Sequence, residues 1–218
     1  MIMIDEKKSF IDILNHLDDK YEWFDKKTPK GSITNAELFY IYRYLLTIGN
    51  PTIFESGVDK GRSTLILSEI INRIGGTLHA AVYNWKYASI DLSFLNKYKN
   101  TNLIYGRSED LIDGFTKIDI SVVDGPKPAG YKWGNPGWSK LVEKSCDIVD
   151  VMFQHDIDDH DSLSIFNNIK YDKYIISQKF LLENNIFGCV ESWKETKPNL
   201  GVIIFNRNVN HTYFTSRS

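Results

Sequence analysis

The spacing of apolar residues divides the chain near residue 50. Before that point, apolar side chains recur at steps of three and four, which is the period of an amphipathic helix. The first such helix is predicted over residues 10–24. A second opens at Thr34-Asn35-Ala36-Glu37, where Thr34 and Glu37 fit a capping box, and should end near Gly49. Together they form a predicted N-terminal helical extension, residues 1–50.

After residue 50, short apolar runs alternate with helical stretches, as in a parallel sheet with crossover helices. Strands are predicted at 52–55, 77–82, 102–105, 118–123, 150–154, 187–193 and 200–206. Helices are predicted at 62–74, 86–98, 109–112 and 138–149, with two weaker ones at 161–168 and 179–185. Because about six residues join the last two strands, no crossover helix fits between them and they should pair antiparallel. We expect one α/β domain over residues 51–218.

Composition narrows the class of protein. The chain has 218 residues, 42% hydrophobic and 25% charged, which suits one globular domain. A net charge of -2 makes nucleic acid an unexpected partner. No apolar run approaches the ~18 residues of a membrane helix, and the charged N-terminus does not fit a signal peptide. Two cysteines match neither a CxxC pair nor a metal-binding spacing. We expect a cytoplasmic protein without a membrane partner, and a homodimer stays open.

The densest chemical signal is the segment IFESGVDKGRST, residues 53–64. An apolar strand ends in Glu55, Gly57 and Gly61 follow with three residues between them, and a helix then begins. Glycines let backbone approach a ligand closely, and a first helical turn offers free N–H groups. The spacing fits neither G-x-G-x-x-G nor the phosphate loop. Ligand binding is one interpretation, and a tight strand-to-helix turn with Glu55 as a capping acid is the other.

This segment resembles the first motif, E-x-G-x-x-x-G, of the class I S-adenosylmethionine (SAM)-dependent methyltransferases. Two later segments agree in order, since Ile118 to Lys127 is similar to the family's fourth-strand motif and Leu103 to Leu111 to its adenine segment. The resemblance covers about residues 50–206. It implies a Rossmann-like α/β fold, with a mostly parallel sheet of about seven strands that ends in an antiparallel hairpin, and it implies SAM as the methyl donor.

The resemblance also assigns donor-binding residues by motif position. They are Glu55, Ser56, Gly57 and Gly61 at the amino-acid end with Ser63 beside them, Asn84 and Trp85 near the ribose and adenine, Arg107 and Ser108 by the base, and Asp124 at the mouth of the site. The family usually has an acidic residue where this chain has Asn84. An amide has one acceptor oxygen and no charge, so donor affinity could fall by about 1 to 2 kcal/mol.

Acceptor chemistry is expected at the carboxyl ends of the fourth and fifth strands, where a hydroxyl must be aligned and deprotonated. These segments more weakly resemble the metal-dependent catechol-type O-methyltransferases. That resemblance implies Asp124 and Asp156 as ligands of Mg²⁺ and Lys127 as the general base. His155 replaces the first residue of the family's acidic pair, and without a metal it is the better base. The aromatic loop 128–138 is either an acceptor-binding lid or core packing.

The predicted function is SAM-dependent methyl transfer to a hydroxyl of a small molecule or glycan. The alternative is a non-catalytic binding domain that keeps the fold but has weakened or lost donor binding. Another nucleotide-dependent Rossmann-type enzyme, such as an oxidoreductase, is disfavoured because G-x-G-x-x-G is absent.

Overall fold

A computed structural model describes residues 5–27, 33–83, 91–125, 137–155, 157, 163, 166–183, 186–187 and 200–215. The elements in these ranges are α1 (Glu6–Lys20), α2 (Asn35–Leu45), β1 (Thr52–Ser56), α3 (Arg62–Ile74), β2 (Thr77–Val82), η1 (Ser93–Leu95), β3 (Thr101–Tyr105), α4 (Ser108–Leu111), η2 (Ile112–Gly114), β4 (Ile118–Val123), α5 (Gly137–Ser145), β5 (Val149–His155), β6 (Asp172–Ile175), α7 (Gln178–Glu183), β7 (Leu200–Ile204) and α8 (Thr212–Thr215). In this part of the chain, each helix is too short or too polar to cross a membrane.

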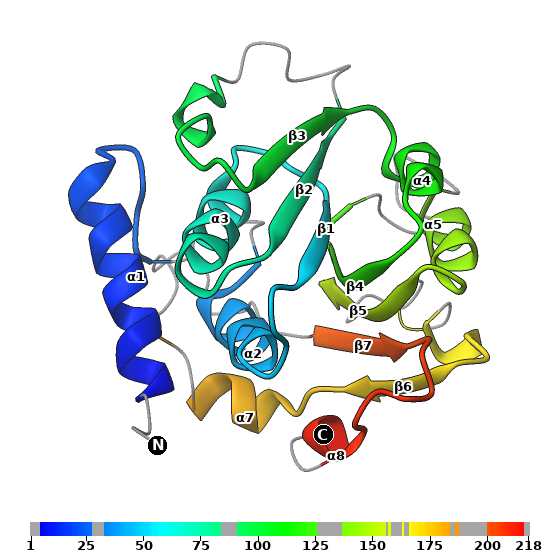
Figure 1. Ribbon diagram of the computed structural model, residues 1–218. Coiled ribbons are helices and arrows are strands. Elements are labelled where there is room, and N and C mark those ends of the chain that lie inside the picture. Colours follow the sequence, from blue (N-terminus) through cyan, green and yellow to red (C-terminus); the bar gives the residue numbers. More distant parts are fainter. Residues whose placement is uncertain are drawn as a thin grey trace.

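Seven strands form one sheet in the order β3-β2-β1-β4-β5-β7-β6 (Figure 1). The first five of these pair parallel, whereas β7 pairs antiparallel with both β5 and β6. The predicted mostly parallel sheet with an antiparallel end is therefore confirmed. The chain runs outward from β1 to β3 on one side and from β4 to β5 on the other. Ligands of open α/β sheets bind at the carboxyl ends of strands where the order reverses, which here lies between β1 and β4.

The partner of the last strand was predicted wrongly. β7 has β5 on one edge and β6 on the other, so a strand at 187–193 cannot pair with it in this sheet. Residues 188–199 lie outside the described ranges, and α7 lies between β6 and β7 along the chain. The strand β6 escaped detection because it has only four residues and forms the edge of the sheet, where half its surroundings are solvent.

Several helix boundaries also differ from the sequence predictions. The helix at 62–74 is confirmed at both ends, but the first helix ends at Lys20, so Tyr21 and Phe24 follow it in a turn. The described end of the predicted helix 86–98 contains only the 3₁₀ turn η1. α5 ends at Ser145 instead of residue 149, because Val149 already pairs with Ile118 of β4. Strand pairing at Val149 therefore ends the helix earlier than the sequence pattern predicted.

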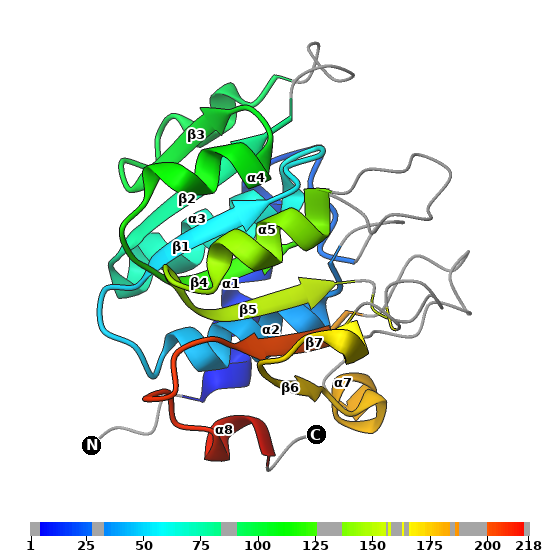
Figure 2. The same cartoon turned by 90° about the vertical axis from the view of Figure 1, so that its right-hand side faces the viewer.

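Helices cover both faces of the sheet, with α1, α2 and α3 on one side and α4 and α5 on the other (Figures 1 and 2). Successive strand residues alternate between the two faces, so Ile53 joins the core under α1 to α3 and Phe54 joins the core under α5. The first of these cores also contains Phe10 and Leu14 of α1 and Leu38 of α2. The N-terminal helices thus share their core with the sheet.

An Asp5→Ala variant tests whether α1 unfolds together with the sheet. Asp5 is the N-cap of α1, and its Oδ1 accepts a hydrogen bond from Lys8 N at 3.0 Å. Loss of this cap should lower the free energy of unfolding by about 1 kcal/mol. Urea unfolding followed by circular dichroism and by tryptophan fluorescence measures the change. Asp5→Asn keeps an acceptor and should restore the wild-type midpoint. An unchanged midpoint in Asp5→Ala would mean that α1 opens independently of the core.

Candidate active site

Two glycines with positive φ shape the turn that follows β1. Gly57 has φ +104°, and a Cβ added there would lie 2.7 Å from Gly125 N and 2.9 Å from Asp124 C. Gly61, with φ +79°, precedes α3, and its Cβ would lie 2.9 Å from Leu92 Cδ2 and Phe94 Cζ. Gly57 therefore lets the turn after β1 lie against the turn after β4, and Gly61 makes room for the segment before β3. Both glycines are required by the packing of the chain itself.

Glu55 brings a buried carboxyl group to the carboxyl end of β1. It is 1% exposed, and its Oε1 accepts a hydrogen bond from Ser63 Oγ of α3 at 2.6 Å. Oε2 accepts no hydrogen bond from the described residues. Burial raises the pKa of Glu55 to about 7, although the Ser63 hydrogen bond and the nearby Thr64 hydroxyl lower it part of the way and the charge of Asp124 raises it further. Such an oxygen would be satisfied by a cationic hydrogen-bond donor.

Hydrogen bonds of Ser56 and Ser108 connect the carboxyl ends of β1, β3 and β4. Their hydroxyl oxygens are 2.6 Å apart, and Ser56 Oγ also donates to the Gly125 carbonyl. Both hydroxyls are therefore engaged within the protein. The neighbouring Arg107 has a half-exposed side chain, whose guanidinium lies 5.7 Å from the ring centroid of Tyr83, just after β2. Of these predicted donor-site residues, Arg107 is the one that faces solvent.

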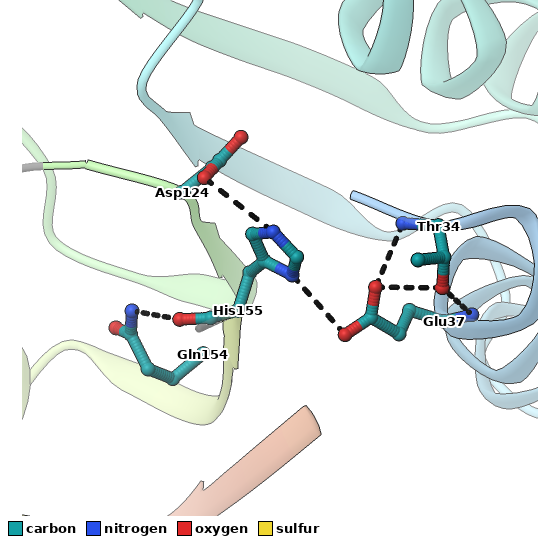
Figure 3. Close-up of polar contacts among 5 residues, drawn as sticks. All are labelled: Thr34, Glu37, Asp124, Gln154 and His155. Atoms are coloured by element: carbon teal, nitrogen blue, oxygen red, sulfur yellow. Dashed lines mark hydrogen bonds and ion pairs between the residues drawn. The ribbon is translucent and has the colours of Figure 1, made fainter. Parts of the chain in front are cut away.

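A second polar group lies at the ends of β4 and β5 (Figure 3). Val123 pairs with Gln154, so the next residues, Asp124 and His155, are neighbours. The residue His155 is 6% exposed, with Nδ1 3.1 Å from Glu37 Oε1 and Nε2 4.0 Å from Asp124 Oδ1. Glu37 comes from the first turn of α2. The three side chains form a row of carboxylate, imidazole and carboxylate at the carboxyl edge of the sheet.

The backbone carbonyl of His155 is held by side chains on the α5 face of the sheet, opposite to the face that carries its imidazole. Gln154 Nε2 donates to the His155 carbonyl at 2.7 Å, and Trp138 Nε1 of α5 donates to Gln154 Oε1. Trp138 is itself fully buried against the core of that face. The end of β5 is thus fixed on one face by α5, while its histidine points to α2 on the other.

Known structures share this arrangement of strands and helices. The SAH-bound methyltransferase PaMTH1 of Podospora anserina aligns with a TM-score of 0.54 and 13% identity, over 94% of this chain and 89% of that chain. The chain has the class I methyltransferase fold. Precorrin-6y C5,15-methyltransferase of Geobacter metallireducens aligns with a TM-score of 0.55 and 11% identity, over 81% and 92% of the two chains. A candidate O-methyltransferase of Klebsiella pneumoniae gives 0.55 and 10%, over 93% and 90%.

Other comparisons found nothing: no family model matches the sequence, and no curated protein does. At identities of 10–13%, the structural likeness establishes the class I methyltransferase fold and leaves the substrate open. The expected fold is confirmed, and the roles of individual residues depend on the geometry of this chain.

On this class I methyltransferase fold, the predicted site residues fall into two groups at one edge of the sheet. Glu55, Ser56, Gly57, Gly61 and Ser63 surround the turn after β1, and Asp124 with His155 lies at β4 and β5. Asn84, Trp85, Lys127 and Asp156 lie outside the described residues, as does most of the loop 128–138, so their roles stay predictions. Within the described ranges, no group of three or more His, Cys, Asp or Glu side chains could hold a metal ion.

Glu37 is the site residue that sequence reasoning missed. Its spacing from Thr34 identified it as part of a capping box, and the structure confirms that box. The contact with His155 joins residues 118 positions apart, for which no local pattern gives a signal. A cap needs only one carboxylate oxygen, however, and the second was available for another partner.

Proposed function

We propose that this protein transfers a methyl group from SAM to a hydroxyl of a small molecule or glycan. One observation carries the proposal. A buried carboxyl at β1, with an oxygen that accepts no hydrogen bond from the described residues, and an Asp124–His155 pair at β4 and β5 lie on the same edge and the same face of a class I methyltransferase sheet. The near-neutral charge of the chain favours such acceptors over nucleic acid.

Glu55 is suited to bind the methyl donor, SAM. SAM, when bound, supplies a methyl group on a sulfonium, which is already an excellent leaving group. Its amino-acid end carries an ammonium group, and Glu55 Oε2 would accept a hydrogen bond from it. The ammonium charge would also offset the cost of ionising a buried carboxyl group. Asn84 and Trp85 near the ribose and adenine remain part of this proposal.

His155 is suited to act as the general base. Its imidazole lies at the end of β5, where the acceptor hydroxyl is expected, and an imidazole nitrogen that carries no proton can accept one from that hydroxyl. Asp124 Oδ1 lies 4.0 Å from Nε2, the nitrogen that would accept the proton, and the Asp124 carboxylate would help to orient the acceptor hydroxyl. The magnesium alternative, with Asp124 and Asp156 as ligands and Lys127 as base, rests on two residues outside the described ranges.

Calorimetric titration with SAM and with SAH, in magnesium buffer and in EDTA, tests the proposal. We expect both ligands to bind below millimolar concentration in both buffers. Methyl-labelled SAM with a panel of catechols and methyl glycosides then tests transfer, which EDTA should not reduce if His155 is the base. Loss of transfer on chelation would instead favour Asp124 and Asp156. No heat at millimolar SAM in either buffer would contradict the enzyme proposal and favour a non-catalytic binding domain.

A further inference from the structure

The first turn of α2 places a fully buried carboxylate against the imidazole at the end of β5. We propose that Glu37 is a positioning residue, which holds His155 in the tautomer with the proton on Nδ1 and turns Nε2 towards Asp124 (Figure 3). A ring held in this way presents Nε2 as the acceptor for the hydroxyl proton. The catalytic meaning rests on the proposed function, whereas the tautomer itself can be measured without it.

The two carboxylate oxygens of Glu37 have different partners. Oε2 accepts hydrogen bonds from Thr34 N and from Thr34 Oγ, both at 2.7 Å. A backbone N–H can only donate, so this oxygen must be an acceptor. Oε1 is the oxygen that faces His155 Nδ1, at 3.1 Å. Because an ionised carboxylate only accepts hydrogen bonds, the ring nitrogen facing it must carry the proton.

On the Nε2 side of the imidazole, the contact with Asp124 is longer than the contact with Glu37 on the Nδ1 side. Asp124 Oδ1 lies 4.0 Å from Nε2, which is beyond hydrogen-bond distance. Glu37 is 0% exposed and His155 is 6% exposed, so little water competes for the bond between them. The proposed tautomer therefore rests on the buried contact at Nδ1, as in metal and protease sites where a carboxylate fixes the orientation of a histidine.

The turn that carries Glu37 is itself fixed by its neighbour. Asn35 Nδ2 donates to the carbonyls of Lys26 and Ile186 at 2.7 and 2.8 Å, and Asn35 Oδ1 accepts from Arg62 at 2.7 Å. Arg62 is the first residue of α3, directly after Gly61. The start of α2 is thereby tied to the start of α3, and Glu37 has a fixed position from which to hold the ring.

A Glu37→Gln variant should reverse the tautomer. Thr34 N still needs an acceptor, so the amide oxygen should stay with Thr34 and the NH₂ group should turn to His155 Nδ1. The ring would then carry its proton on Nε2 and could not accept one there. Nitrogen-15 NMR of labelled histidine in alkaline buffer measures the tautomer, with a His155→Gln variant to assign the signal. Where transfer is measurable, kcat should fall by about 100-fold or more with KM changed only a few-fold.

Glu69→Gln is the matched control, because Glu69 is another nearly buried helical glutamate with two side-chain partners, Arg73 and Tyr98. It should leave the His155 tautomer unchanged. An Nε2–H tautomer in the unsubstituted protein would overturn the proposal, even if Glu37→Gln fails to fold. An unchanged tautomer in a folded Glu37→Gln variant would overturn it as well. Reversal of the tautomer in a protein that does not bind SAM would uphold the positioning role and refute only the proposed function.

Discussion

A Gly57→Ala variant should lose most of its SAM affinity and much of its stability. A Cβ at this position would lie 2.7 Å from Gly125 N, and the backbone φ of +104° is strained for any L side chain. The strain alone costs about 1 to 3 kcal/mol. The clash adds to it because the opposing atoms are backbone. Asp124 N donates to Ser56 O at 2.9 Å beside this contact, so the strand ends cannot separate without breaking their pairing.

Urea unfolding and calorimetric titration with SAM measure the two effects of the substitution. We expect the free energy of unfolding to fall by about 2 kcal/mol or more and the Kd for SAM to rise at least about tenfold. Gly114→Ala is the matched control, since a Cβ there meets no atom within 4 Å, and it should change neither quantity appreciably. Wild-type affinity in a destabilised Gly57→Ala variant would remove this turn from the donor site.

Glu55 should make the stability of the protein depend on pH. Burial raises its pKa to about 7 from an ordinary value of 4.5, so the folded state binds the proton more tightly than the unfolded state does. The stabilisation from the protonated form is fully present below about pH 4.5 and is lost as the pH rises through about 7. The difference amounts to roughly 3 kcal/mol as an order of magnitude. Urea midpoints from about pH 5 to about pH 8 should therefore fall on this account.

A Glu55→Gln variant should remove this part of the pH dependence and be the more stable protein at about pH 8. SAM binding gives a second readout, because the ammonium group favours the ionised carboxylate. Below about pH 7, binding should release a proton, which calorimetry in buffers of different ionisation enthalpy detects. The proton release should vanish in Glu55→Gln. Glu69→Gln removes another nearly buried carboxyl of α3 and should keep it. Binding without proton release in the wild type would separate Glu55 from the donor.

The sequence by itself determined the local elements and their order. The capping box at Thr34 and Glu37, the helix from Arg62 to Ile74 and the apolar runs of the parallel strands depend on hydrogen bonds and side-chain periods within a few residues. The turn after β1 could be predicted for the same reason, since only glycine tolerates the positive φ that it requires. These features predicted a mostly parallel α/β sheet, and the resemblance of residues 53–64 to a family motif implied the class I methyltransferase fold.

Only the tertiary structure decided which distant groups meet. It paired β7 with the short edge strand β6 and joined the Ser56 and Ser108 hydroxyls by a hydrogen bond. It also brought Glu37 into contact with His155. Each of these contacts depends on how helices pack on a sheet, which no spacing along the chain records. Burying a carboxylate is favourable only where the fold supplies its partners, so Glu37 could be predicted from the sequence as a helix cap, whereas its contact with His155 could be seen only in the fold.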